Sequence, residues 1–170
     1  MMNYFIIYEE CCFYEIVILS YFMKATNQEM RFCSLNGQSI KTMEGFCVES
    51  DISINEIDVT GAKSIILTGG TIANVKSDKV IELLKDARNK KVLIGAICAG
   101  VDVLEESEIL QEVGSIHSVD LDVVNEKNII TARPNAYVDF AIEVAKELDL
   151  FEDENDIQET IDFWKLHRRV

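Results

Sequence analysis

The stretch Val92-Leu-Ile-Gly-Ala-Ile-Cys-Ala-Gly100 decides the fold, because in it an apolar run ends abruptly at a cysteine. Short apolar runs of this kind are typical of strands that are buried on both faces of a parallel sheet. The small residues Ala96 and Gly100 stand two positions before and two positions after Cys98. This arrangement predicts a sharp strand-to-helix turn, the nucleophile elbow, with Cys98 in strained backbone geometry.

The predicted elbow has a chemical consequence for Cys98. Its sulfur would lie at the N-terminus of the next helix, where the helix dipole and free N–H groups favour thiolate and lower the thiol pKa. The alternative is a small apolar residue that fills the strand end, as free cysteines usually do. Cys33 and Cys47 have no such setting. Cys11 and Cys12 follow the first strand, at the sheet edge where parallel sheets place their sites, so both are candidates for lining the pocket.

Strand and helix patterns alternate on either side of the elbow. Apolar runs predict buried strands over residues 4–8, 31–35, 64–67 and 92–97. Amphipathic spacing predicts helices over residues 13–23, 78–89, 137–148 and 157–167, and a helix directly after Cys98. Residues 119–124 and 128–131 are expected to pair as strands, and residues 39–53 to form a small hairpin or extended excursion. The alternation predicts an α/β fold with a mainly parallel sheet between helices, and the length predicts one domain over residues 1–170.

Composition excludes several classes of function. Lys and Arg number 16 against 30 Asp and Glu, and the formal net charge of −14 argues against nucleic-acid and anionic-membrane partners. Five scattered cysteines and two distant histidines give no metal-ligand spacing, so no metal is expected. Gly69-Gly70 lacks the other glycines and the lysine of nucleotide-binding loops, so no cofactor is expected.

The apolar N-terminal region resembles neither a secretory signal nor a membrane span. It lacks a basic segment, and Glu9, Glu10 and Glu15 interrupt its apolar runs. An odd number of cysteines without a disulfide pattern fits a reducing compartment, so we expect a cytoplasmic protein.

Several stretches together resemble the ThiJ/PfpI superfamily, which includes the parkinsonism-linked deglycase and is class I glutamine amidotransferase-like. They are Ala96-Ile-Cys-Ala-Gly100, Leu67-Thr-Gly-Gly70, Tyr8-Glu-Glu-Cys-Cys-Phe-Tyr-Glu15, Asn128-Ile-Ile-Thr-Ala132, Tyr137-Val-Asp-Phe-Ala141 and Phe163-Trp164. The resemblance covers nearly the whole chain. It implies a flavodoxin-like three-layer sandwich and a homodimer.

The resemblance also implies roles for individual residues. Glu15 matches the glutamate that hydrogen-bonds the reactive cysteine, and a protonated carboxyl there can stabilise a thiolate and act as general acid/base. Gly70 matches the glycine whose N–H, with that of Ala99, can face an oxyanion. Gly69 is a further pocket-lining candidate. His117 stands where relatives place a histidine near the cysteine, with Asp120 or Asp122 as candidates for a third member.

Three functions fit these residues. The first is an enzyme in which Cys98 attacks a small electrophilic molecule, with hydratase, glyoxalase-like or amidase chemistry. Members that use a Cys-His dyad often place histidine directly after the cysteine, whereas this chain has Ala99, which argues against peptidase activity. The second is a non-catalytic oxidative-stress sensor in which Cys98 is oxidised to sulfenic or sulfinic acid. The third is a scaffold whose dimer or ligand pocket matters more than its thiol.

Overall fold

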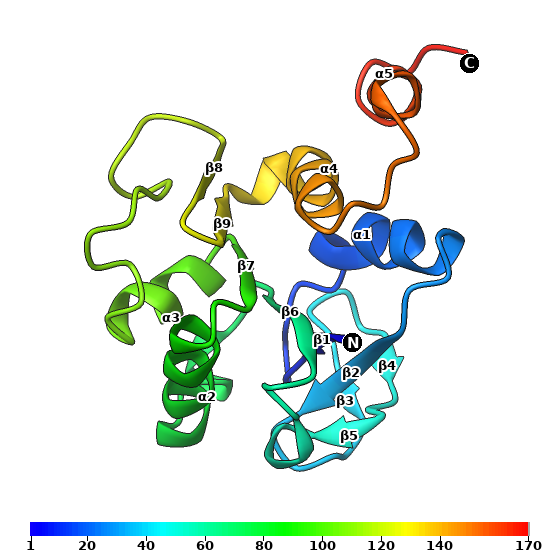
Figure 1. The fold of residues 1–170 in the computed structure, drawn as a ribbon. Coiled ribbons are helices and arrows are strands. Elements are labelled where there is room, and N and C mark those ends of the chain that lie inside the picture. Colours follow the sequence, from blue (N-terminus) through cyan, green and yellow to red (C-terminus); the bar gives the residue numbers. More distant parts are fainter. Residues whose placement is uncertain (170) are drawn as a thin grey trace.

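The computed structural model describes residues 1–169, and its centre is a seven-stranded sheet (Figure 1). The strand order is β5-β2-β1-β6-β7-β9-β8, and neighbouring strands are parallel except for the antiparallel pair of β8 and β9. The strands are β1 (Met2–Ile6), β2 (Met30–Ser34), β5 (Ile52–Ser53), β6 (Ala62–Leu67), β7 (Leu93–Ile97), β8 (Val123–Glu126) and β9 (Ile129–Ala132). The predicted mainly parallel sheet is confirmed.

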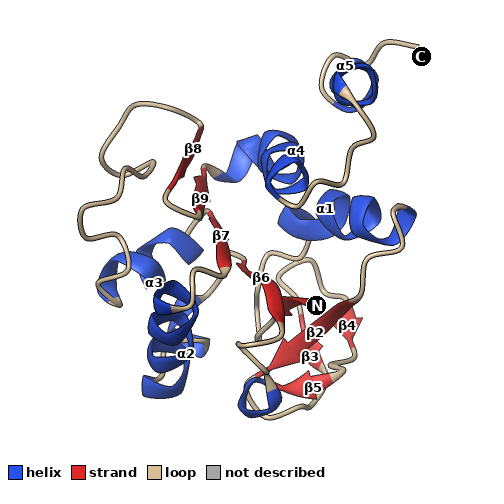
Figure 2. Cartoon of the chain, in the orientation of Figure 1, coloured by secondary structure: helices blue, strands red, loops and turns tan. Residues whose placement is uncertain are grey.

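Helices cover both faces of this sheet, which completes the flavodoxin-like three-layer sandwich (Figure 2). One face carries α1 (Tyr14–Ala25) and α4 (Tyr137–Glu147), which pack together, and α5 (Glu154–Trp164) lies outside these two helices. The other face carries α2 (Asp78–Asn89) and α3 (Gly100–Glu106), both packed against β7. Short 3-10 turns occur at Ile54–Glu56, Ile72–Asn74 and Pro134–Ala136. Within the described residues, no helix is both long and apolar enough to cross a membrane.

The apolar runs that predicted strands are buried because helices lie on both sides of them. Every residue of β7 is buried, as are Ile65, Ile66 and Leu67 of β6. Burial on both faces explains why these strands are continuously apolar rather than alternating.

The sheet has a topological switch point between its neighbouring strands β1 and β6. From β1 the chain passes through α1 to β2 on one side, whereas from β6 it passes through α2 to β7 on the other. Open α/β sheets bind ligands outside the carboxyl ends of strands at such a point. Glu15 follows β1, Gly69 follows β6 and Cys98 follows β7, so all three lie at this edge.

Several predicted elements are displaced along the chain. The strand expected over 119–124 is β8, Val123–Glu126, since residues 115–120 turn and Arg133 draws Asp120 and Asp122 into ion pairs before the strand. The last helix begins at Glu154 rather than 157, because the Asp153 carboxylate accepts hydrogen bonds from the N–H groups of Asn155 and Asp156.

The excursion expected over residues 39–53 is a hairpin of β3 (Ile40–Lys41) and β4 (Cys47–Val48), followed by β5. This hairpin forms a separate two-stranded sheet, whereas β5 pairs with β2 in the central sheet.

Candidate active site

Cys98 occupies a nucleophile elbow between β7 and α3. Its φ is +58°, in the left-handed region that non-glycine residues rarely adopt, so the predicted backbone strain is confirmed. A Cβ on Gly100 would lie 2.8 Å from the carbonyl oxygens of Leu67 and Thr68. A Cβ on Gly69 would lie 2.7 Å from Cys98 Sγ. The elbow therefore requires glycine both after the cysteine and in the neighbouring strand end.

Glu15 is the acidic partner that lies beside this cysteine. It stands in the first turn of α1, yet only 1% of its surface is exposed. Its Oε2 accepts a hydrogen bond from the Gly69 N–H at 2.7 Å, whereas Oε1 is buried and has no geometrically well-formed hydrogen bond within residues 1–169. Burial raises the pKa of Glu15 to about 7, although the Gly69 N–H and the nearby Cys98 and Tyr14 side chains oppose this. Glu15 is therefore able to take or give a proton near neutral pH.

The environment of the Cys98 thiol differs from the expected one. Burial and, to a smaller extent, the Glu15 carboxylate together raise its pKa to about 12, although the Ala99 N–H favours the thiolate. The expectation of an acidic thiol at a helix N-terminus is therefore wrong, because burial and the adjacent carboxylate outweigh the backbone donor. The proton lost near neutral pH is therefore that of Glu15, and the resulting carboxylate is the base available to accept the proton of the Cys98 thiol.

The two cysteines that follow β1 have different surroundings. Cys12 is partly exposed, and its N–H donates to the Gly69 carbonyl at 2.9 Å, which places its backbone beside Gly69. Cys11 is fully buried in the core, so its assignment as a pocket-lining residue is wrong. The Cys11 backbone pairs with Gly70 in an isolated bridge, and its side chain belongs to the hydrophobic core, where it has no contact with solvent.

The two backbone donors proposed for an oxyanion differ in what they face. The Ala99 N–H is directed at the Cys98 sulfur, where it favours negative charge. Gly70 has a φ of +124°, and a Cβ there would collide with the Glu10 carbonyl. Among the described residues, the Gly70 N–H has no hydrogen-bond acceptor, and it is therefore free to meet a developing anion.

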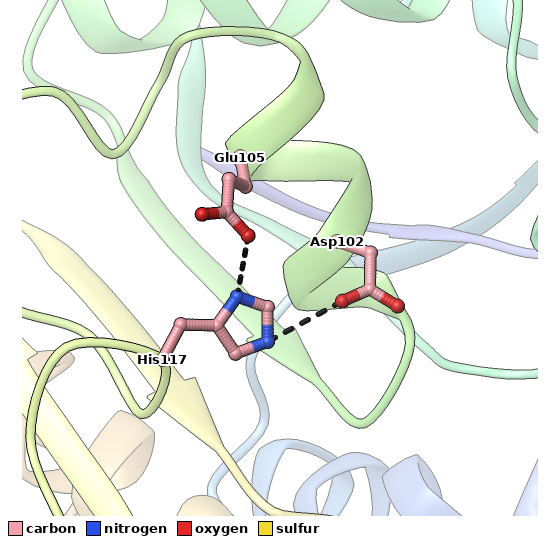
Figure 3. A group of neighbouring side chains, drawn as sticks. All are labelled: Asp102, Glu105 and His117. Carbon is pink, nitrogen blue, oxygen red and sulfur yellow. Dashed lines mark hydrogen bonds and ion pairs between the residues drawn. The ribbon is translucent and has the colours of Figure 1, made fainter.

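His117 belongs to a different group of side chains (Figure 3). Its Nδ1 lies 2.7 Å from Glu105 Oε2, and its Nε2 lies 3.3 Å from Asp102 Oδ1. Both ring nitrogens thus face carboxylates of α3, which leaves neither for Cys98. Asp120 and Asp122 lie near Arg133, at 2.7 and 3.7 Å, so neither forms a triad through His117.

The same group is the one in residues 1–169 whose geometry could hold a metal. One ligand atom from each of Asp102, Glu105 and His117 lies within 4.8 Å of the others. All three side chains are substantially exposed, at 47%, 61% and 30%. His117 forms a hydrogen bond with Glu105 and lies within ion-pair distance of Asp102, so the three side chains already contact one another.

Sequence reasoning missed two residues that border Glu15. The ring of Tyr14, 42% exposed, makes an edge contact with Tyr137 of α4 at 5.6 Å between centroids. Glu44, in the β3–β4 hairpin, accepts a hydrogen bond from the Tyr14 N–H at 2.8 Å. Tyr14 stands directly before Glu15 and was available as a signal, whereas nothing in the sequence connects Glu44 with residues 30 positions away.

These features define a class of protein: an α/β sandwich in which a strained cysteine at the end of a central strand lies beside a buried glutamate. The model of the DJ-1/PfpI family matches residues 3–147. The chain therefore belongs to the DJ-1/PfpI family, as the sequence motifs predicted.

Known relatives agree with this assignment. The Bacillus subtilis protein YoaZ, which carries the name "Uncharacterized protease", is 28% identical over 137 residues, covering 69% of this chain. The chain spans only 65% of the length of that relative. A DJ-1 superfamily protein from Agrobacterium tumefaciens has the same fold, with a TM-score of 0.88 and 22% identity over 99% of this chain and 100% of its own. Drosophila melanogaster DJ-1beta matches with a TM-score of 0.78 and 22% identity, covering 99% and 98% of the two chains.

Proposed function

We propose that this protein is a cysteine-nucleophile enzyme that acts on a small electrophilic molecule through Cys98, with Glu15 as acid/base. The observation that carries the proposal is the pairing of a strained, half-buried thiol with a buried carboxyl whose pKa is raised to about 7. Perturbed titratable groups of this kind cluster at catalytic sites.

The geometry supports a balanced first step. The Cys98 sulfur bonds to the electrophilic carbon while its proton passes to the Glu15 carboxylate, and the electron pair of the carbon–oxygen double bond moves to oxygen. The N–H groups of Gly70 and Ala99 stabilise that oxygen as its charge develops. Glu15 then returns the proton to the oxygen, which gives a neutral covalent adduct. Glyoxalase-like and amidase reactions begin with an adduct of this type, whereas in the hydration of an isonitrile the terminal carbon takes both the Cys98 sulfur and the proton from Glu15, which gives a thioimidate that water then attacks.

The test is turnover of neutral dicarbonyl, isonitrile and amide substrates by the wild type and by Cys98→Ser. We expect turnover of at least one class and its loss, by about a hundredfold or more, in the variant. Cys47→Ser is the matched control, because Cys47 is exposed on β4 and should leave the rate unchanged. Turnover that survives in Cys98→Ser would contradict the proposal.

A second candidate function is an oxidative-stress sensor. A half-buried thiol beside a carboxyl that can be neutral is also suited to hold an oxidised sulfur, since a protonated Glu15 donates to a sulfinate oxygen. A structural neighbour of the same fold, Toxoplasma gondii DJ-1, is described as oxidized. The sensor predicts stoichiometric peroxide oxidation of Cys98 before Cys12 and Cys47, without turnover of any of the substrates above, as measured by peptide mass spectrometry.

A further inference from the structure

The β3–β4 hairpin is docked over the turn that leads from β1 into α1. The Met43 N–H donates to the Cys11 carbonyl at 2.9 Å, and the Glu10 N–H donates to the Lys41 carbonyl at 2.8 Å. Two backbone hydrogen bonds from separate residues fix the hairpin against this turn. Its tip, which carries Glu44, is therefore held next to the first turn of α1.

Glu44 provides the N-terminal cap that α1 lacks in its own sequence. The N-cap residue Phe13 offers no side-chain hydrogen bond, and the Tyr14 N–H donates instead to Glu44 Oε1 at 2.8 Å. A negative carboxylate at this helix end is favourable because of the helix dipole and the free N–H groups. Although partial burial pulls the other way, the hydrogen bonds from Tyr14 and Thr42 lower the pKa of Glu44. Glu44 is therefore ionised at neutral pH.

The charge of Glu44 acts on the groups of the active site. It raises the pKa of Glu15 and of Cys12, in each case alongside the larger effect of burial. The other charged groups that principally affect Cys98, Cys12 and Glu15 are themselves carboxyl or thiol groups, and no lysine, arginine or histidine is among them. These carboxyl and thiol groups therefore make the potential at the site negative when they are ionised.

We propose that Glu44 is a specificity-determining residue of the Cys98 site, which accepts neutral and cationic electrophiles and disfavours those that carry a carboxylate or phosphate. The charge is fixed there by the hydrogen bond to α1, so it persists whether Glu15 is protonated or not. Repulsion between unit charges about 4 Å apart, when it is screened as in bulk water, changes a rate by roughly three- to tenfold. This proposal deepens the proposed function and rests on it, because it requires Cys98 to be the reacting atom.

Two alkylating reagents with the same leaving group test the charge preference. Iodoacetamide is neutral and iodoacetate is anionic, and the ratio of their rates at Cys98 is measured by peptide mass spectrometry at one pH. The ratio for N-acetylcysteine amide, a neutral thiol, provides the reference. Because both reagents consume the same thiolate, a change in the Cys98 pKa cancels in the ratio.

We expect the iodoacetamide-to-iodoacetate rate ratio at Cys98 to exceed the reference ratio by roughly three- to tenfold. In Glu44→Gln, most of this excess should be lost. Glutamine keeps an oxygen that accepts from the Tyr14 N–H but removes the charge. Glu49→Gln is the matched control, since it removes an exposed carboxylate from the same segment and should leave the ratio unchanged. In the wild type, 0.5 M salt should lower the ratio by screening, which tests the proposal without any variant.

The outcomes separate the two proposals. A wild-type ratio equal to the reference, or one that neither Glu44→Gln nor salt lowers, overturns the role of Glu44 while Cys98 remains a reactive nucleophile. If neither reagent labels Cys98 in the native protein, the proposed function fails and the role of Glu44 fails with it.

Discussion

Cys98, which is paired with Glu15, lies just before α3, and the His117 cluster uses two carboxylates of the same helix, but the two groups differ in how completely their polar atoms are satisfied. At the elbow, a buried carboxyl oxygen lacks a well-formed hydrogen bond and the cysteine backbone is strained. In the cluster, His117 lies between Asp102 and Glu105, and each side chain is open to solvent. A buried polar atom without a hydrogen bond destabilises the fold, and such atoms and strained residues are found mainly at functional sites. The side chains of the His117 cluster contact one another and solvent, so the cluster carries no comparable destabilisation.

The largest effect is expected from Gly69→Ala, which adds a methyl group against Cys98. The added carbon would lie 2.6 Å from Cys98 Cβ and 2.7 Å from its sulfur. Overpacking of this kind costs about 1–3 kcal/mol of unfolding free energy. Displacement of the sulfur should slow Cys98 labelling by about a hundredfold.

Urea denaturation and iodoacetamide labelling measure the two effects of Gly69→Ala. Gly114→Ala is the control, because the one atom within 3 Å of its added carbon is Oε2 at the flexible end of Glu126, at 2.6 Å. Equal behaviour of the two variants would show that the elbow does not depend on close approach at residue 69.

An intermediate effect is expected from Glu15→Gln on the pH dependence of labelling. In the wild type, the labelling rate should rise through a step near pH 7, where Glu15 loses its proton and becomes the carboxylate that accepts the Cys98 thiol proton during the reaction. Without the carboxyl, the remaining thiol is still buried and should ionise only at alkaline pH. The step near pH 7 therefore disappears in Glu15→Gln, and its persistence would remove Glu15 from the site.

Glu15→Gln should also raise the free energy of unfolding at alkaline pH. The pKa of Glu15 is raised from 4.5 to about 7, so the folded state binds this proton more tightly than the unfolded chain. Protonation of Glu15 therefore contributes fully to the free energy of unfolding of the wild type below about pH 4.5, and this contribution is lost as the pH rises to about 7. Glu15→Gln should be more stable than the wild type at pH 8 by about 1–3 kcal/mol, and this advantage should shrink at pH 5. Urea denaturation at both pH values measures it.

The smallest effect is expected from His117→Ala. Exposed ion pairs contribute about 0–1 kcal/mol, so the melting temperature should change by only a few degrees. Turnover and Cys98 labelling should stay within about twofold of the wild type, because neither ring nitrogen faces the thiol. A loss of turnover comparable to that of Cys98→Ser would instead place His117 in the catalytic machinery.

Sequence reasoning located the elbow because its signal is local. An apolar run, a cysteine and small residues at fixed spacing fall within nine positions, and the same short range dictates the turn. Glu15 and Gly69 were identified through motifs of the family, and the structure brings both to Cys98. The inward direction of Cys11 and the raised pKa of Cys98 were not predictable, since both depend on what packs around them.

His117 shows the limit of reasoning from position along the chain. It was expected beside Cys98, but the loop before β8 carries it to the exposed face of α3. Its partners Asp102 and Glu105 look like ordinary surface carboxylates in the sequence. Glu44 is the converse case, because a hairpin with no motif supplies the cap of a distant helix.

By itself, the sequence determined the layered α/β fold and the cysteine at the strand end, because buried strands and tight turns depend on residues that are close together in the chain. Only the tertiary structure decided the acid–base character of the site. Burial, backbone donors and charges that reach Cys98 come from β1, β6, α1 and the hairpin, and their combined effect depends on distances through space. Electrostatic energies follow those distances, which the order of residues does not specify.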